Sequence, residues 1–164
     1  MSALLSECGR YRYSLERSTG IEGPCLVWLM LNPSTADATK DDPTIRKVVG
    51  FSRRNGYGFA LVVNLFAWRA TKPKDCLLNL ADAEGHLNCR AITDAAKLSD
   101  RIVCAWGAQP WAREQAENVL GWIPDATLVC LGTNGDGSPR HPLMQPYAQP
   151  LVPFERMRRE RATP

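Results

Sequence analysis

Two asparagines and one histidine occupy positions where side chains could take part in chemistry. Asn32 and Asn64 each lie near the end of a run of apolar residues, and His141 closes a long polar loop. A carboxamide offers one acceptor and two donors, and an imidazole exchanges protons near neutral pH. Such groups could position a water molecule, recognise a polar ligand and stabilise negative charge on a leaving group.

Each asparagine also has a structural interpretation. Pro33 favours an extended conformation for the residue before it, which places the Asn32 side chain where a strand ends and a cavity can begin. The sequence Asn32-Pro33-Ser34 would serve equally well as a turn. A buried amide without partners costs about 1–3 kcal/mol, so Asn64 is expected either to bond to backbone or to face a ligand.

Several neighbouring residues could complete a site. Asp37 and Asp41 are possible general bases, and Phe51 or Trp68 could stack on a flat ligand, although a structural role is favoured for Asp37, Asp41 and Phe51. The loop from residue 67 to 75 carries three cations and an aromatic residue, which suits phosphate and base contacts but also an ordinary connection. The candidate catalytic residues are Asn32, His141 and Asp37, and the candidate substrate-binding residues are Asn64, Pro33, Ser34, Phe51, Trp68, Arg69, Trp106 and Arg140.

The elements that must position these residues alternate between strands and helices. Apolar runs predict four buried strands, at residues 25–31, 59–66, 101–107 and 126–131. Helical periodicity predicts helices over residues 43–54, within 82–100 and over 111–122, and the first of them has Asp42 as an acceptable N-cap and Pro43 in its first turn. This alternation predicts an α/β fold of three layers, α/β/α, around a central, mainly parallel four-stranded sheet.

The carboxyl ends of parallel strands lie at one edge of a sheet, and sites in open sheets usually lie there. Asn32, Asn64, Trp106 and His141 are therefore expected to meet at that edge. A further strand is expected over residues 8–17, at the outer edge of the sheet with its charges pointing outward.

Length and composition limit the remaining possibilities. The 164 residues predict a single domain, with a folded core over 8–154 and a basic tail over 155–164 that could be flexible. The chain is 45% hydrophobic and 23% charged, with no run near the roughly 18–20 apolar residues of a membrane helix and no signal-peptide core. A cytoplasmic location without membrane contact is expected.

The net charge and the cysteine content bear on the partners and cofactors of the protein. The net charge of +3 neither requires nor excludes nucleic acid as a partner. The six cysteines form no C-x-x-C pair, and only two histidines could join them, so no metal and no other cofactor is expected. Cys104 and Cys130 lie within apolar runs and are predicted to be small core residues.

Four segments resemble, in chain order, motifs of the uracil-DNA glycosylase superfamily. Residues 30–34 resemble a strand end in which an Asn or Asp orients the hydrolytic water, which would be Asn32. Residues 62–69 resemble a strand whose Asn recognises the base edge, here Asn64, followed by an Arg. Residues 105–107 and 140–143 resemble the two remaining motifs, and the second implies that His141 stabilises charge on the departing base.

Residues 31–37, 41–46 and 63–71 more closely resemble a family of small bacterial and phage proteins known as DUF1643. Together the resemblances imply a glycosylase-like hydrolase that cleaves an N-glycosidic bond to a modified or damaged base in nucleic acid, DNA more than RNA. Two alternatives stay open: an enzyme of the same fold acting on a free nucleotide or another small substrate, and a non-catalytic module that binds nucleic acid or a base.

Overall fold

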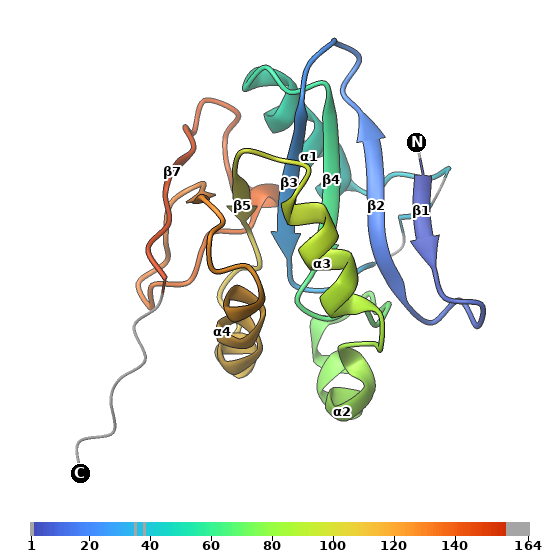
Figure 1. Cartoon of the computed structure of the whole chain (residues 1–164). Coiled ribbons are helices and arrows are strands. Elements are labelled where there is room, and N and C mark those ends of the chain that lie inside the picture. Colours follow the sequence, from blue (N-terminus) through green and yellow to red (C-terminus); the bar gives the residue numbers. More distant parts are fainter. Residues whose placement is uncertain (1, 35, 38, 157–164) are drawn as a thin grey trace.

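The computed structural model describes residues 2–34, 36–37 and 39–156, with the side chains of residues 77–81 left aside. This part of the chain forms a seven-stranded sheet with the strand order β1-β2-β4-β3-β5-β6-β7 (Figure 1). The strands are β1 (Ser2–Leu5), β2 (Arg12–Ser18), β3 (Cys25–Met30), β4 (Phe59–Asn64), β5 (Ile102–Cys104), β6 (Leu128–Cys130) and β7 (Val152–Pro153).

The centre of the sheet is parallel, as the sequence predicts. Strands β4, β3, β5 and β6 are neighbours that all run in the same direction, and they correspond to the four expected apolar runs. Strands β2 and β7 join this core by antiparallel pairing, and β1 pairs antiparallel with β2, so the complete sheet is larger than expected and mixed. The parallel pairing places Met30 opposite Asn64.

Helices cover both faces of the sheet (Figure 1). Helix α1 packs on one face, where Val48 and Phe51 meet Trp28 and Val62 in one apolar cluster. Helices α3 and α4 pack on the other face, where their apolar residues join a second cluster. The helices are α1 (Pro43–Arg54), α2 (Leu80–Ala83), α3 (Asn88–Ala96) and α4 (Arg113–Trp122), with 3-10 turns η1 (Pro73–Asn79), η2 (Pro110–Ala112) and η3 (Pro142–Met144).

Helix α1 begins where its capping residues predict. Pro43 occupies the first turn, and the Asp42 side chain accepts a hydrogen bond of 2.8 Å from the Ile45 N–H. Helix α3 is shorter than the segment expected within 82–100, because the chain turns between α2 and α3 through Gly85, which has φ 81°. Such a backbone conformation suits glycine and ends a helix.

The expectation of an outer edge strand over residues 8–17 is wrong. Strand β2 lies between β1 and β4, so β1 forms the edge. Arg12 and Arg17 of β2 are only 2% and 1% exposed, rather than pointing outward. Their guanidinium groups instead donate to the main-chain carbonyls of Ala36, Asp37 and Lys40, and Arg17 also pairs with Asp41.

The path of the chain makes β3 a switch point. The chain leaves β3 through α1 to β4 on one side, and later returns to β5 on the other side of β3. Neighbouring connections then lie on opposite faces of the sheet, and a crevice opens beyond the carboxyl end of β3. Cys104 and Cys130, which the sequence predicts as core residues, are both buried.

Hydrogen bonds from Arg156 hold the C-terminal segment against the end of α4. Its guanidinium donates to the carbonyls of Leu120, Ile123 and Pro124, which follow or end α4. Residues 157–164 of the expected basic tail lie outside the described residues.

In the described residues, no helix combines the length and apolar character that crossing a membrane requires.

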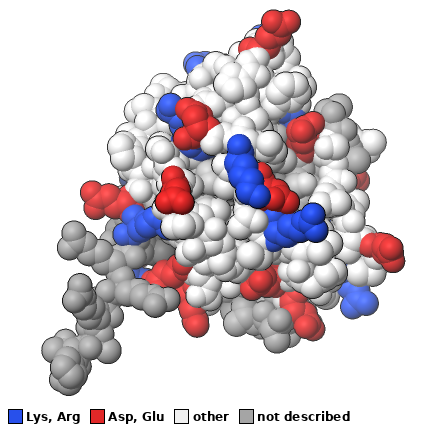
Figure 2. All heavy atoms as spheres, in the orientation of Figure 1, with Lys and Arg blue, Asp and Glu red and all other residues white. Residues whose placement is uncertain are grey.

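The surface on the side of α3 and α4 carries both signs of charge. Figure 2, in the orientation of Figure 1, shows Lys and Arg interspersed with Asp and Glu rather than gathered into a basic patch. Several pairs are in contact, such as Lys97 with Asp94 at 2.9 Å. A long nucleic-acid track on this face has no electrostatic support.

Candidate functional site

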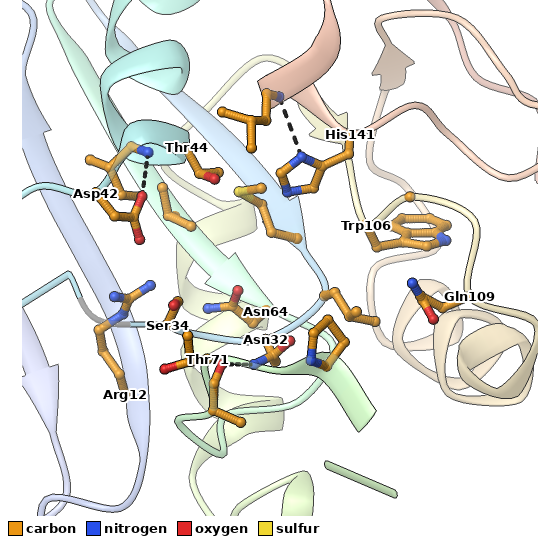
Figure 3. Close-up of a pocket in the computed structure, with 18 of the residues that line it drawn as sticks. Arg12, Asn32, Ser34, Asp42, Thr44, Asn64, Thr71, Trp106, Gln109 and His141 are labelled. Atoms are coloured by element: carbon orange, nitrogen blue, oxygen red, sulfur yellow. Dashed lines mark hydrogen bonds between the residues drawn. The ribbon is translucent and has the colours of Figure 1, made fainter. Parts of the chain in front are cut away.

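A cavity of about 400 Å³ lies at the carboxyl ends of β3, β4 and β5 (Figure 3). This volume is within the range typical of small-molecule sites. Its wall also includes the start of α1 and the turn η3. The lining residues are Arg12, Met30, Leu31, Asn32, Ser34, Asp42, Thr44, Ile45, Val62, Asn64, Ala70, Thr71, Pro73, Trp106, Gly107, Ala108, Gln109, His141 and Leu143.

Asn32 follows β3 directly and is held in a fixed orientation. Its Nδ2 donates to the carbonyls of Pro33 and Ala70, at 3.0 and 2.8 Å. Two carbonyl acceptors require the NH₂ group on that side, so Oδ1 occupies the other position of the amide. No described residue donates to Oδ1, which leaves an acceptor at the cavity wall for a water molecule or ligand.

Asn64 forms part of the cavity floor at the end of β4. The residue is 1% exposed, yet its Nδ2 has no partner within the described structure, and no described residue bonds to its Oδ1. The main-chain carbonyl of Asn64 is satisfied separately by the side chain of Asn88 at 2.9 Å. Because a buried unpaired amide is destabilising, we expect this carboxamide to form hydrogen bonds with a ligand or water in the cavity.

His141 presents one ring nitrogen to the cavity. Its Nδ1 accepts a hydrogen bond from the Leu143 N–H at 3.3 Å, and the other nitrogen points into the cavity (Figure 3). Burial lowers the pKa of His141 below its usual 6.5, against the opposing effect of the Asp42 charge. The ring is therefore neutral at pH 7 with its proton on Nε2, which makes Nε2 a donor toward the cavity.

The position of His141 depends on contacts on both sides of it. The Gly107 N–H donates to the Pro139 carbonyl at 3.0 Å, which ties the loop before His141 to the end of β5. Gly107 has φ 78°, and a Cβ atom there would lie 3.4 Å from the His141 Cβ. After His141, Lys47 of α1 donates to the Gln145 carbonyl at 2.7 Å.

Asp42 brings a carboxylate to the same cavity. One of its oxygens caps α1 by accepting from Ile45, and the second is turned toward the Arg12 side of the cavity (Figure 3). Sequence analysis identifies Asp42 only as a helix cap. The two expected carboxylates lie elsewhere: Asp41 pairs with Arg17 at 2.6 Å, and Asp37 does not line the cavity.

Asp37 has a structural role in its loop. Its Oδ1 accepts from the N–H groups of Thr39 and Lys40, both at 2.9 Å, and from the Thr39 hydroxyl. These hydrogen bonds, led by that of the Thr39 N–H, lower the pKa of Asp37. A carboxylate stabilised in this way is a weak base, so the structure gives Asp42 the position that the sequence suggested for Asp37.

Arg12 is the buried cation of the site. Its Nη1 donates to the Ala36 carbonyl at 2.6 Å, whereas its Nε is buried with no partner among the described residues. Burial lowers the pKa of Arg12 to about 10, an effect that the Asp42 charge opposes. The guanidinium therefore stays charged at neutral pH at one side of the cavity (Figure 3).

Of the candidate residues from the sequence, the structure brings Asn32, Ser34, Asn64, Trp106 and His141 together around this cavity. Trp106 is 3% exposed and packs edge-on against Phe154, so it forms part of the wall.

The other candidates lie outside the cavity. Phe51 is fully buried and packs between Trp28 and Tyr147, so its ring faces the core rather than a ligand. Pro33 is buried, and its carbonyl accepts from Asn32 and from the Ala70 N–H.

Three further candidates occupy other surfaces. Trp68 packs edge-on against Tyr11 at 5.4 Å, and Arg69 donates to the Gly9 carbonyl at 3.1 Å, both near the β1–β2 connection. Arg140 is exposed, and its Nε donates to the Thr133 carbonyl. None of the three lines the described cavity.

Sequence analysis missed Arg12, Thr44, Thr71 and Gln109, all of which line the cavity. The Arg-Tyr-Arg-Tyr segment around Arg12 has the alternation of an exposed strand, so it gave no signal of burial. Thr44 follows the cap and Pro43, and its position next to a predicted helix start could have indicated it.

Among the residues that the structure describes, no group of three or more His, Cys, Asp or Glu side chains could hold a metal ion. The polar groups of the cavity are amides, hydroxyls, one imidazole, one carboxylate and one guanidinium.

Fold and cavity define an α/β protein with a polar pocket at the switch point of a mixed sheet. A family model described as "Protein of unknown function (DUF1643)" matches residues 12–143, and the chain belongs to that family. The matched region begins at Arg12 and ends at Leu143, so it contains every residue that lines the described cavity. No curated protein and no solved structure matches the chain.

Proposed function

We propose that this protein hydrolyses an N-glycosidic bond and releases a base from a nucleotide or nucleic acid, on a fold like that of the uracil-DNA glycosylases. The main support is the Asn64 carboxamide, which is buried, whose Nδ2 has no partner among the described residues, and which shares its cavity with the Nε2 donor of His141. An amide, which has one acceptor and two donors, complements the polar edge of a nucleobase. The motif resemblances at Asn32, Asn64 and His141 support the same assignment.

The chemistry needs little acid–base machinery. As the bond between the sugar and the base breaks, its electron pair moves to the base, and the sugar develops oxocarbenium character. The reaction is accelerated by a water held near the anomeric carbon and by a donor aimed at the base, where negative charge develops.

The cavity residues supply these functions in the proposal. Asn32 Oδ1 accepts a hydrogen bond from the water, and the free oxygen of Asp42 takes its proton as the water oxygen bonds to the sugar. His141 Nε2 donates to the base as it leaves with the bonding electrons. Asn64 holds the base edge in register with that donor.

A base-release assay tests this proposal. The substrates are uracil, hypoxanthine and phage-type modified bases, each as a free nucleotide and within single- and double-stranded DNA. The wild-type chain is expected to release free base from one member. Asn32→Ala and His141→Ala are each expected to lower the rate by about 10²–10³-fold, as loss of an aligned hydrogen-bonding group does. Arg90→Gln, on the exposed surface of α3, is the control and keeps the wild-type rate.

Two outcomes separate the proposal from its alternatives. Absence of free base with every substrate, together with binding that Asn32→Ala and His141→Ala weaken, would replace the enzyme with a binding module. Salt distinguishes the substrate form: affinity for DNA falls steeply as salt rises when several phosphates are neutralised, and affinity for a free nucleotide falls far less.

A further inference from the structure

Arg12 has a buried guanidinium with unused donors and borders the cavity, whereas Arg69, whose Nε also lacks a partner among the described residues, lies outside it. The side chain of Arg12 is 2% exposed, Nη1 is occupied by Ala36, and Nε has no partner in the described chain. No described residue accepts from Nη2, and the guanidinium lies at the cavity wall (Figure 3). Burying a charge without a counter-charge is costly, so an arrangement of this kind favours an anionic ligand.

Arg17 shows how the same strand satisfies an arginine that has a structural role. Its exposed fraction is similar, at 1%, but its Nε pairs with Asp41 at 2.6 Å and its remaining donors reach carbonyls of residues 16, 37 and 40. Arg12 has no carboxylate within salt-bridge distance among the described residues. The difference between the two residues is that Arg12 borders the cavity and Arg17 does not.

A group beside Arg12 suits an oxyanion. Ser34 lines the cavity with a hydroxyl group and lies next to the Arg12 guanidinium (Figure 3). A guanidinium fork favours phosphate oxygens, and a hydroxyl group can donate to them. The volume of about 400 Å³ also exceeds what a base alone requires.

Asp42 limits where an anion can bind. Its charge lies close enough to influence both Arg12 and His141, so a phosphate placed against the Asp42 carboxylate would be repelled. A ligand that suits both Arg12 and Asp42 therefore places its anionic group at Arg12 and a hydroxyl group, or a bound water, at Asp42. A nucleotide has this arrangement, with a phosphate on one side of the sugar and hydroxyl or water positions on the other.

We propose that Arg12 forms a phosphate subsite inside the cavity, so that the substrate is a nucleotide that binds with its own phosphate beside the guanidinium. This inference rests on the proposed function and adds the substrate class to it. The phosphate belongs either to a free nucleotide or to a nucleotide unit within a strand.

Binding measured by calorimetry tests the subsite. The probes are inorganic phosphate, a panel of nucleosides, the matching nucleoside 5′-monophosphates, and short single strands with the same bases. The wild-type chain is expected to bind at least one monophosphate about 10–100-fold more tightly than its nucleoside, as expected for charged hydrogen bonds. Inorganic phosphate is expected to compete with that monophosphate.

Variants identify the residue. Arg12→Gln is expected to remove the preference for the monophosphate while leaving nucleoside affinity unchanged, and Arg12→Lys to retain part of it, since lysine keeps the charge without the fork. Asp42→Asn is expected to tighten monophosphate binding, because it removes the repulsion and keeps the helix cap. Arg90→Gln removes the same positive charge as Arg12→Gln and is the control for that variant. If Arg12→Gln does not fold, phosphate competition and Asp42→Asn still decide the question.

The outcomes distinguish this inference from the proposed function. Equal affinities for nucleoside and monophosphate, with base release intact, would overturn the subsite and leave the glycosidic reaction standing. Failure of every nucleotide and strand to bind, with no base release, would overturn both. Among ligands that support the subsite, tighter binding of the free monophosphate than of the strand identifies a free nucleotide, and the reverse identifies a nucleotide within a strand.

Discussion

Polar residues of similar kinds lie at both ends of the parallel strands, but their hydrogen bonding differs between the two ends. At the amino end, the Ser99 hydroxyl bonds to the Cys25 and Arg101 carbonyls, and the Tyr57 hydroxyl donates to Asp100 at 2.9 Å. Thr19 likewise donates to a carbonyl at 2.7 Å. These polar groups join loops to strands, and their partners lie within the protein.

At the carboxyl end, the described structure leaves polar atoms without protein partners. The amide of Asn64, Oδ1 of Asn32 and donors of Arg12 surround one cavity, whereas the unpartnered Arg69 Nε and Asn88 Oδ1 lie outside it. Unsatisfied buried groups reduce stability, whereas satisfied ones stabilise the fold. The comparison suggests that the amino end stabilises the sheet and the carboxyl end is reserved for a ligand.

The largest expected difference between the two ends concerns their carboxylates. Asp42→Asn is expected to lower the rate of base release by about 10²–10⁴-fold, because it removes the proposed base while asparagine still caps α1. Asp100→Asn, at the amino end, is expected to leave the rate unchanged. Single-turnover base release measures both. Equal losses in the two variants would contradict a special role for the cavity carboxylate.

The pH dependence of His141 provides the second test. Burial lowers the pKa of His141, so the folded chain binds fewer protons than the unfolded chain below pH 6.5, and folding stability falls as the pH decreases through that range. Base release is expected to stay constant from pH 8 to 6.5 and to fall at lower pH, where protonation of Nδ1 breaks its bond to Leu143. An NMR titration of the ring with its inflection above pH 6.5 would refute this account.

Stability should respond in opposite ways at the two ends. Asn64→Leu is expected to leave the free energy of unfolding unchanged or to raise it, because the change removes an unsatisfied buried amide. Ser99→Ala is expected to lower it by about 1 kcal/mol by removing satisfied hydrogen bonds. Urea unfolding compares the two variants. The comparison fails if Asn64→Leu is the more destabilising.

Two glycines in left-handed conformation give the smallest effect. Gly107 and Gly20 have φ 78° and 80°, so alanine at either position should cost about 1–2 kcal/mol of stability. Only Gly107 adjoins His141, whereas a Cβ at Gly20 meets open space. Gly107→Ala is therefore expected to reduce base release several-fold beyond any loss of folded protein, and Gly20→Ala to leave the rate per folded molecule intact.

Much of the framework was predictable from the sequence. The four apolar runs become the parallel strands, and Asp42 and Pro43 begin α1 as expected, because local patterning determines both features. The meeting of Asn32, Asn64 and His141 at one edge followed from the parallel arrangement. A structural role was favoured for Phe51 over its role as a candidate binding residue, and the structure buries its ring in the core.

The remaining features depend on contacts between distant segments. The buried guanidinium of Arg12 is held by the loop after β3, whose Ala36 carbonyl accepts from it. Strand β1, which makes β2 an inner strand, is only four residues long, so its pattern is weak. The two-residue β7 is still harder to recognise. The second oxygen of Asp42 faces the cavity because Arg17 and Arg12 hold the preceding loop, a constraint that local sequence does not contain.

The side-chain amide signal of Asn64 in a ¹⁵N-resolved NMR titration tests the central claim most directly. The titrants are the nucleoside 5′-monophosphates of the base panel, and the Asn55 side-chain amide, bonded to the Phe51 carbonyl near the amino end, is the internal control. The account predicts a saturable shift of the Asn64 signal with a fixed Asn55 signal. A shift at Asn55 alone, or no shift at Asn64 with any nucleotide, would contradict it.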